Sequence, residues 1–324
     1  MPCAAPGSCQ ADATAAEKLR RAALEKMQHS KLTDMKSALD ALQYAPIVDR
    51  DNIAKLSITR GPMLNVDDWS SATLDEHQSR FFMPCDWPQD WLEYEAWGGW
   101  WVPMDEINLY SSGNLHYPEL RSSWFQESLG KLQDLCPEVW DDYCDCETIA
   151  RDIGLHLPHR QFTRGGRLSD HESEGVLAYL AKRETDRPHA QCLIIDSADN
   201  AADEVLLRSE IDTAITMCQY QLSDGFFVDH HTKPILITTI MRNQTGRLTQ
   251  AYFDGKKNKI VLHQSRLFDL SGKRPGPDAW ILLRWMASTP VGLTKYPDAA
   301  ADGDVQTDWG KASLAPRITI TSSP

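Results

Sequence analysis

The sequence lacks the features that most directly assign a chain to a class of protein. Its longest apolar runs, such as residues 234–240, are too short to cross a bilayer, and no basic start followed by an apolar stretch opens the chain. It contains no glycine-rich phosphate loop, no Gly-x-Ser-x-Gly turn and no HExxH motif. We therefore predict an intracellular protein, cytoplasmic or nuclear, with no membrane association and no activity that a single motif identifies.

Cysteine is sparse and irregularly spaced. Eight cysteines lie in 324 residues, whereas secreted disulfide scaffolds are short and dense in cysteine, so we expect reduced thiols. One group has the ligand chemistry of a zinc site, but its first three members follow the spacing C-x7-C-x-C and not the usual two to four residues. Zinc and thiols without a special role stay as alternatives for Cys136, Cys144, Cys146, His156 and His159.

Acidic residues dominate the chain, which carries a net charge of −13, but one segment reverses the balance. Residues 233–297 hold eleven Lys or Arg against three acids. Exposed together, these side chains would form a basic face for a polyanion or a protein partner. Alternatively, the basic segment docks on the acidic remainder of its own chain. The candidate contact residues are Arg242, Arg247, Lys256, Lys257, Lys259 and Arg266.

Composition divides the chain into five segments. These are a disordered N-terminus (1–10), a helical segment (11–60), an acidic tryptophan-rich region (61–159), a core of strands and helices (160–297) and a C-terminal tail (298–324).

The helical segment shows a clear period. Apolar positions recur at three- and four-residue steps over residues 19–42, with Lys and Arg between them. This pattern predicts two amphipathic helices, broken near His29-Ser30, that serve packing or self-association. Further on, the alternation IAKLSITR predicts a short strand that ends at Gly61.

Eight of the eleven tryptophans lie in the acidic tryptophan-rich region. Because tryptophan buries a large area with few torsions, one interpretation is a hydrophobic core built without regular elements. The other is an exposed platform that stacks sugars or bases. Acids within the run DWPQDWLEYEAWGGWWVP make an anionic partner less favourable there.

Residues 209–288 give the clearest secondary-structure signal. Helical spacing is followed by three β-branched and aromatic runs, separated by glycine-containing turns, and then by helical spacing again. The pattern predicts a helix, three antiparallel strands and a second helix. We expect Phe253 and Leu262 to lie on buried faces of these strands.

The residues before that helix have two interpretations. Residues 174–196 belong either to a helix capped by Ser169 or to two strands, EGVLAYLA and QCLIIDS, joined by a polar loop. The second accommodates Pro188 better, because proline is tolerated in a loop. The fold class that follows is α+β: N-terminal helices, an irregular tryptophan-rich region, and a mixed or antiparallel sheet flanked by helices.

The order of the expected elements resembles the PD-(D/E)xK nuclease-like fold. That order is strand EGVLAYLA, strand QCLIIDSAD, helix LRSEIDTAITMCQYQL, strand PILITTIMR and then a hairpin. In that family two carboxylates hold a divalent metal and a lysine helps to position the attacking water. The resemblance implies Glu174 and Asp196 as the two acids, with Glu210 assisting. Ala198 stands where the lysine should be, so we expect a degenerate catalytic site. The later segments GRLTQAYFDG, SRLFDL and ILLRWMASTPVGLT also look like a family of uncharacterised filamentous-fungal proteins.

These patterns together predict a binding or interaction protein built on a catalytically degenerate nuclease-like core. One alternative is a nuclease or phosphodiesterase that uses Glu174, Asp196 and Glu210 with Mg²⁺ or Mn²⁺, and the sequence names no other cofactor. A further alternative is a small-molecule enzyme with a tryptophan-lined pocket. The triplet Asp229-His230-His231 matches a manganese phosphoesterase family, but without that family's other aspartate motifs we expect it to be an exposed loop.

Overall fold

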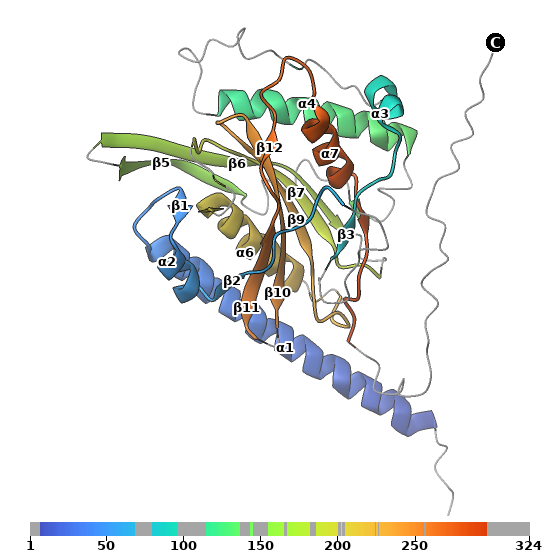
Figure 1. Cartoon of the computed structure of the whole chain (residues 1–324). Coiled ribbons are helices and arrows are strands. Elements are labelled where there is room, and N and C mark those ends of the chain that lie inside the picture. The colour runs from blue at the N-terminus through green and yellow to red at the C-terminus, as the bar shows by residue number, and fades with distance from the viewer. Residues whose placement is uncertain are drawn as a thin grey trace, which may run out of the picture.

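The computed structural model describes residues 7–68, 80–95, 101, 115–136, 143–144, 155–164, 167–181, 186–199, 202, 205–223, 225, 227–255 and 257–296. The fold is α+β, as predicted: a long N-terminal helix lies beside a mixed sheet that carries packed helices on both faces (Figure 1). None of the described helices has a stretch both long and apolar enough to span a bilayer.

The first element is one continuous helix, α1 (Gly7–Ala41), and not the two helices that the sequence suggested. His29 and Ser30 are tolerated inside a helix, and neither the backbone freedom of glycine nor the missing N–H of proline interrupts this stretch. The helix also begins at Gly7, inside the stretch expected to be disordered, because the alanines that follow favour helix.

The mixed sheet is the framework of the molecule. In the described part it has nine strands, and seven of them follow one path. In spatial order that path is β2 (Ile58–Arg60), β11 (Lys259–Gln264), β10 (Thr245–Asp254), β9 (Ile235–Met241), β7 (Ala190–Asp196), β6 (Arg167–Ala181) and β4 (Tyr143–Cys144). Off the path, β12 (Phe268–Asp269) pairs with β10 and β5 (His156–Arg164) pairs with β6. The pairs β7–β9 and β11–β2 are parallel, and the other pairs are antiparallel.

The central strands β7 and β9 have the apolar sequences from which they were predicted. Every residue of β7 and β9 is buried, as expected for strands that are covered on both faces. The helix α6 (Arg208–Ser223) connects them, so β7, α6 and β9 form a crossover between parallel strands. Residues 174–181 and 190–196 lie in two strands, which confirms the second interpretation of that stretch. The predicted three-stranded unit is also confirmed, with Phe253 and Leu262 buried.

The segment after α1 forms strands that pair with strands of the core, although its composition predicted a mainly helical segment. It contains β1 (Ile47–Val48), which pairs with β8 (Leu206–Leu207), then α2 (Arg50–Lys55) and β2. The predicted strand IAKLSITR is therefore limited to Ile58–Arg60. Its first half is helical because the Asp49 side chain caps α2 and accepts a hydrogen bond from Asn52 N at 2.8 Å.

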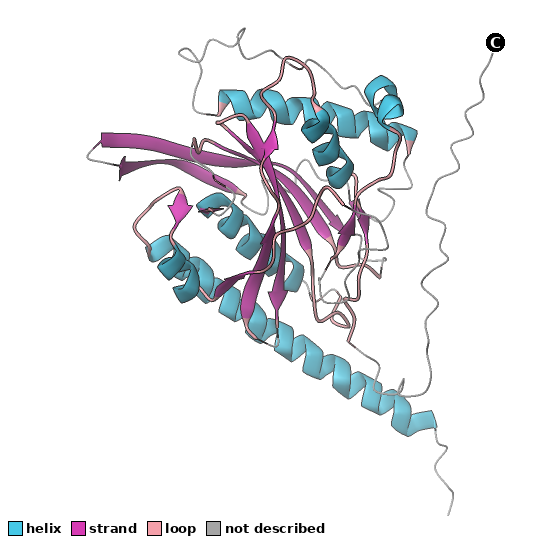
Figure 2. Cartoon of the chain, viewed as in Figure 1, coloured by secondary structure: helices cyan, strands magenta, loops and turns pink. Residues whose placement is uncertain are grey.

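Helices cover the two faces of the sheet and bury two hydrophobic clusters. On one face α1 packs against α6, and the buried residues include Leu32, Met35 and Leu39 (Figure 2). On the other face lie α4 (His116–Leu135) and α7 (Pro277–Met286), with α3 (Gln89–Glu95) beside them. A small two-stranded sheet, β3 (Phe82–Met83) with β13 (Thr289–Pro290), completes the described fold.

The second face contains a buried tryptophan cluster. Its members, found together in one hydrophobic core, are Trp87, Trp101, Trp124, Trp280 and Trp285. Trp124 makes edge contacts with Trp101 and Trp280 at ring-centre distances of 5.0 and 5.4 Å. For these residues the core interpretation is confirmed. The region is also more regular than expected, because α4 runs through it for 20 residues.

Candidate functional site

The carboxylates implied by the nuclease resemblance do not form one group. In the antiparallel pair β6–β7 the partner of Asp196 is Ser173, whereas Glu174 pairs with Ile195. Successive residues of a strand point to opposite faces of the sheet, so Glu174 and Asp196 lie on opposite faces. Glu174 is exposed, and Asp196 is completely buried. This corrects the expectation that the two acids share a site.

Asp196, at the end of β7, is the centre of a buried hydrogen-bond network. Ser209 Oγ, from the first turn of α6, donates to Oδ2, and the backbone N–H of Ala198 donates to Oδ1 at 2.7 Å. His171 Nε2 lies 2.9 Å from Oδ1, so this nitrogen carries a proton and donates it to the carboxylate. Tyr44 OH lies 2.6 Å from His171 Nδ1, within hydrogen-bond distance.

The order hydroxyl, imidazole, carboxylate is the order that activates nucleophiles in hydrolases. Here, however, the phenol comes from the segment that follows α1, and Tyr44 lines neither of the two cavities described below. The network joins Tyr44 to β6, β7 and α6, and so fixes the start of that segment on the sheet. We interpret it as a structural network.

Glu210 accepts more hydrogen bonds than Asp196 does. Arg247 donates to it through Nε at 2.9 Å and Nη2 at 2.6 Å, and Thr249 Oγ1 donates at 3.0 Å. Gln264 Nε2 and the Leu207 backbone N–H each donate at 3.1 Å. Both side chains of the Arg247–Glu210 pair have 0% exposure. Glu210 therefore has no oxygen available for a metal, and Arg247 belongs to the core and not to a basic face, which corrects that prediction.

The other predicted basic contacts do not gather in one place. Arg242 lies in the turn before β10, Lys257 lies in the turn after it, and Lys259 begins β11, so the length of a ten-residue strand separates Arg242 from the two lysines. Arg266 pairs with Asp67 at 2.7 Å and with Asp278 at 2.8 Å. Lys256 is outside the described residues.

The hydrogen bonds that Arg266 donates to Asp67 and Asp278 hold the pKa of Arg266 above its usual value. Asp67 belongs to the acidic tryptophan-rich region, so this contact is the intramolecular docking that the charge pattern offered as an alternative.

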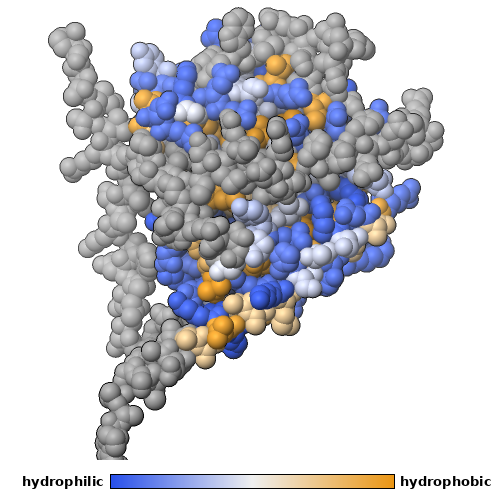
Figure 3. Space-filling model, turned by 180° about the vertical axis from the view of Figure 1, so that it is seen from behind, coloured by the Kyte–Doolittle hydropathy of each residue, from blue (hydrophilic) through white to orange (hydrophobic). Residues whose placement is uncertain are grey.

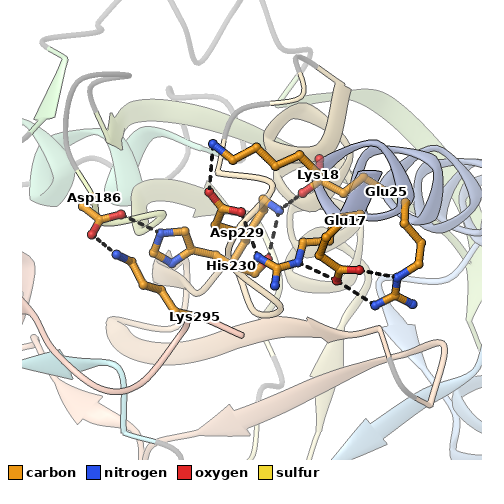
Figure 4. Close-up of polar contacts among 10 residues, drawn as sticks. Glu17, Lys18, Glu25, Asp186, Asp229, His230 and Lys295 are labelled. Atoms are coloured by element: carbon orange, nitrogen blue, oxygen red, sulfur yellow. Dashed lines mark hydrogen bonds and ion pairs between the residues drawn. The ribbon is translucent and has the colours of Figure 1, made fainter. Parts of the chain in front are cut away.

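A further group of charges connects α1 to the loop before β9 (Figure 4). Glu25 and Lys233 form an ion pair in which both side chains are buried. Burial raises the pKa of Glu25 and lowers that of Lys233, while their mutual attraction opposes both shifts. Arg21 donates to Asp229 at 2.8 Å. The N-terminal part of α1 is thus held largely by polar contacts.

The same loop contains the Asp229-His230-His231 triplet. The sequence predicted an exposed loop there, but His230 is buried. Its side chain is 3% exposed, with Nδ1 2.7 Å from Thr294 Oγ1 and Nε2 3.1 Å from Asp186 Oδ1. Lys295 also pairs with Asp186. The triplet therefore connects α1 and residues 294–296 to the loop before β9.

The proposed zinc ligands fall mostly outside the described side chains. Only Cys136 is described, and it is buried. Among the described residues no group of three or more His, Cys, Asp or Glu is arranged to hold a metal ion.

The clearest open site is a cavity of about 970 Å³ between the β1–α2–β2 segment and the sheet. Its apolar wall includes Ile47, Val48, Ile53, Ile58, Val205 and Leu206. Gln264, at the end of β11, contributes a polar group to the lining. A second cavity of about 420 Å³ shares Ala54, Ile58 and Thr59 with the lining of the first. Neither cavity is lined by a described tryptophan, in contrast to the tryptophan-lined pocket of one alternative.

The sequence did not predict this site because its walls come from three segments that lie far apart in the chain, within residues 47–63, at 205–206 and at 264. Comparison with known proteins adds no assignment: no protein-family model, curated protein or solved structure matches this chain.

Proposed function

We propose that this chain is a binding protein built on a nuclease-like core that does not catalyse hydrolysis. The observation that carries the proposal is the state of the family carboxylates. Asp196 and Glu210 are buried and fully hydrogen-bonded within the fold, and Glu174 lies on the opposite face from Asp196. A metal-dependent nuclease needs carboxylate oxygens that converge on one cation.

The position of the family lysine supports the same conclusion. Ala198 occupies it and contributes only a backbone N–H to Asp196. Losing a positioned proton-transfer or cationic group typically lowers a rate by about two to four powers of ten. With neither converging acids nor lysine, the core has lost both parts of the family's chemistry.

The cavities support binding as the remaining role. The larger has the size of known small-molecule sites, which span roughly 300–1,000 Å³ and are mostly apolar with a few polar groups. Among the described residues, by contrast, the basic side chains predicted to contact a polyanion are divided between ion pairs and opposite ends of β10.

The test is a cleavage assay on the full chain. Purified protein is incubated with single- and double-stranded DNA and RNA in the presence of Mg²⁺ or Mn²⁺, beside an Asp196→Asn variant and a Glu174→Gln variant. We expect no cleavage above the buffer rate in any of the three. Metal-dependent cleavage by the parent chain that is lost in Asp196→Asn would overturn the proposal.

A further inference from the structure

Helix α1 contacts the rest of the molecule in two different ways along its length. From residue 32 onward its buried side chains are apolar and belong to the cluster that it shares with α6 and the sheet. Between residues 17 and 28 the only buried side chains are the polar ones of Glu25 and Gln28. We call residues 17–28 the arm of α1, and in Figure 1 this end of the helix extends past the strands. Hydrophobic burial therefore holds the second part of α1 and contributes little to the arm.

Charged side chains attach the arm to the rest of the fold (Figure 4). Arg21 donates to Asp229 Oδ1 at 2.8 Å, and its guanidinium lies 4.7 Å from the centre of the Tyr296 ring. Lys18 Nζ lies 3.9 Å from Asp229 Oδ2, and both of these side chains are exposed. Ion pairs that water can reach contribute little to stability. These contacts therefore orient the arm more than they stabilise it.

The ion pair of Glu25 with Lys233 is the buried attachment of the arm. Lys233 Nζ donates to Glu25 Oε1, and its other acceptor, His230 O, lies farther away at 3.4 Å. Glu25 Oε2 is buried and has no hydrogen-bond partner among the described residues. An incompletely satisfied buried ion pair adds little net stability, because the cost of burying two charges offsets their attraction.

Losing one charge of this pair has a larger effect than the pair itself. The remaining charge would be buried without compensation in the closed structure, and it would regain water only if the arm moved away. The pair therefore permits the closed position of the arm only while both charges are present.

We propose that the arm of α1 is a releasable strap and that the ion pair between Glu25 and Lys233 is its latch. In the closed state Arg21 and Glu25, four residues apart and so on one face of the helix, meet Asp229 and Lys233. In the open state the rest of α1 stays anchored by its apolar residues, while Asp229, Lys233 and Tyr296 become accessible. This conformational device goes beyond the proposed function and does not depend on it.

The parent chain is tested by amide hydrogen exchange, followed residue by residue on the full-length protein. Once detached, so short a helical segment is marginal in water, and segments that open as one unit exchange together. We expect similar protection over residues 21–28 and protection at least a hundredfold higher over residues 33–40. Equal protection in the two parts, or a gradual decline from residue 33 toward the N-terminus, would overturn the strap.

The latch is tested with two variants that share one substitution. Glu25→Leu removes the carboxylate and leaves Lys233 buried alone, so we expect protection of residues 21–28 to fall at least tenfold below that of the parent. Adding Lys233→Met replaces the pair by two apolar side chains, and the arm should regain at least the protection of the parent. If the carboxylate did not act as a latch, Glu25→Leu alone would protect the arm as well as the parent or better, because leucine favours both helix and burial.

A second ion pair of α1 supplies the matched control. Lys36 pairs with Asp212 of α6 in the part of the helix that is packed by apolar residues, and the Lys36 side chain is 29% exposed, so its charge can reach water. We expect Asp212→Asn to change protection of residues 21–28 less than twofold, and a tenfold fall there would overturn the assignment of the latch. Protection of the β9 amides, unchanged in every variant, shows that the sheet stays folded and that the effect is local.

Discussion

At the scale of single residues, His189 links the buried core to pH. Its ring lies between Phe81 and Phe82, with centre distances of 6.5 and 5.3 Å, and Nε2 donates to Val291 O at 3.0 Å. Burial is the main cause that lowers the pKa of His189 from 6.5 to about 4. The folded state therefore holds this imidazole neutral at pH values where the unfolded chain has already bound a proton.

The sign of the effect follows from that difference. The unfolded state takes up the proton as pH falls below 6.5, and the folded state takes it up only near pH 4. Stability present above pH 6.5 is thus lost between pH 6.5 and 4, and the shift corresponds to about 3 kcal/mol. We expect His189→Gln, which keeps a donor for Val291 O, to show a weaker loss of unfolding free energy over this range. Urea unfolding at several pH values measures it, and parallel pH profiles of the variant and the parent would contradict the assignment.

Also at this scale, the candidate acids show where sequence reasoning stops. The order of strands placed Asp196 at a strand end and Glu210 on the following helix, and both placements are confirmed. Sequence order does not reveal which face a residue occupies, and an offset of one residue, Glu174 against Ser173, moves the carboxylate to the other side of the sheet. Nor does it reveal that Arg247, 37 residues after Glu210, supplies the matching charge.

At the scale of elements, the spacing of apolar residues predicted the central strands of the sheet and the helices α6 and α7. β9, β10 and β11 have the β-branched and aromatic content that suits strands, and α6 and α7 have helical spacing. The helix α4 was not predicted, although its buried residues Trp124, Ser128 and Leu132 recur at four-residue steps, because a tryptophan-rich composition is also compatible with an irregular core. The sequence predicted two helices where the structure has the single helix α1. The inner face of α1 is polar at Arg21, Glu25 and Gln28 and becomes apolar only farther along the helix.

In the N-terminal part of α1 the inner face is polar, so apolar side chains of this part are exposed to solvent. Leu19 and Met27 are 73% and 70% exposed, and hydrophobic residues stand beside hydrophilic ones along the lower edge of the view in Figure 3. Farther along the helix, Leu32, Met35 and Leu39 are buried against the sheet side. A sequence pattern shows which residues share a face, but it does not show how far along a helix that face stays covered.

The β10–β11 pair carries a prediction at the same scale. Phe253 is 5% exposed and belongs to the cluster between the sheet, α1 and α6. Replacing it by alanine removes a large ring and leaves a cavity, so Phe253→Ala should lower the free energy of unfolding by about 3 to 5 kcal/mol. Chemical denaturation measures the change, and Lys55→Ala on the surface of α2 is the control that should change it little. A melting curve identical to that of the parent would show that Phe253 does not pack as described.

At the scale of the whole molecule, the segments predicted from composition are joined by the sheet and by ion pairs. β2 comes from the helical segment, yet it pairs with β11 of the core, and β1 pairs with β8. Asp67 from the acidic region meets Arg266, and Glu25 from α1 meets Lys233. The charge asymmetry along the sequence is thus used inside the molecule, which composition alone could not distinguish from a basic surface that faces a partner.

This use of charge predicts how the full chain behaves toward polyanions. The chain carries a net charge of −13, and Arg247, Arg266 and Lys233 are each paired with acids of the same chain. We expect it to pass through a heparin column at low salt and to be retained by an anion exchanger. An Asp67→Asn, Asp278→Asn variant should elute later from heparin than the parent, because it frees Arg266 and removes two negative charges. Binding of polyanions through Lys or Arg weakens as salt rises, because bound counterions are released. Salt-sensitive retention of the parent chain on heparin would therefore show that its basic residues form an external surface after all.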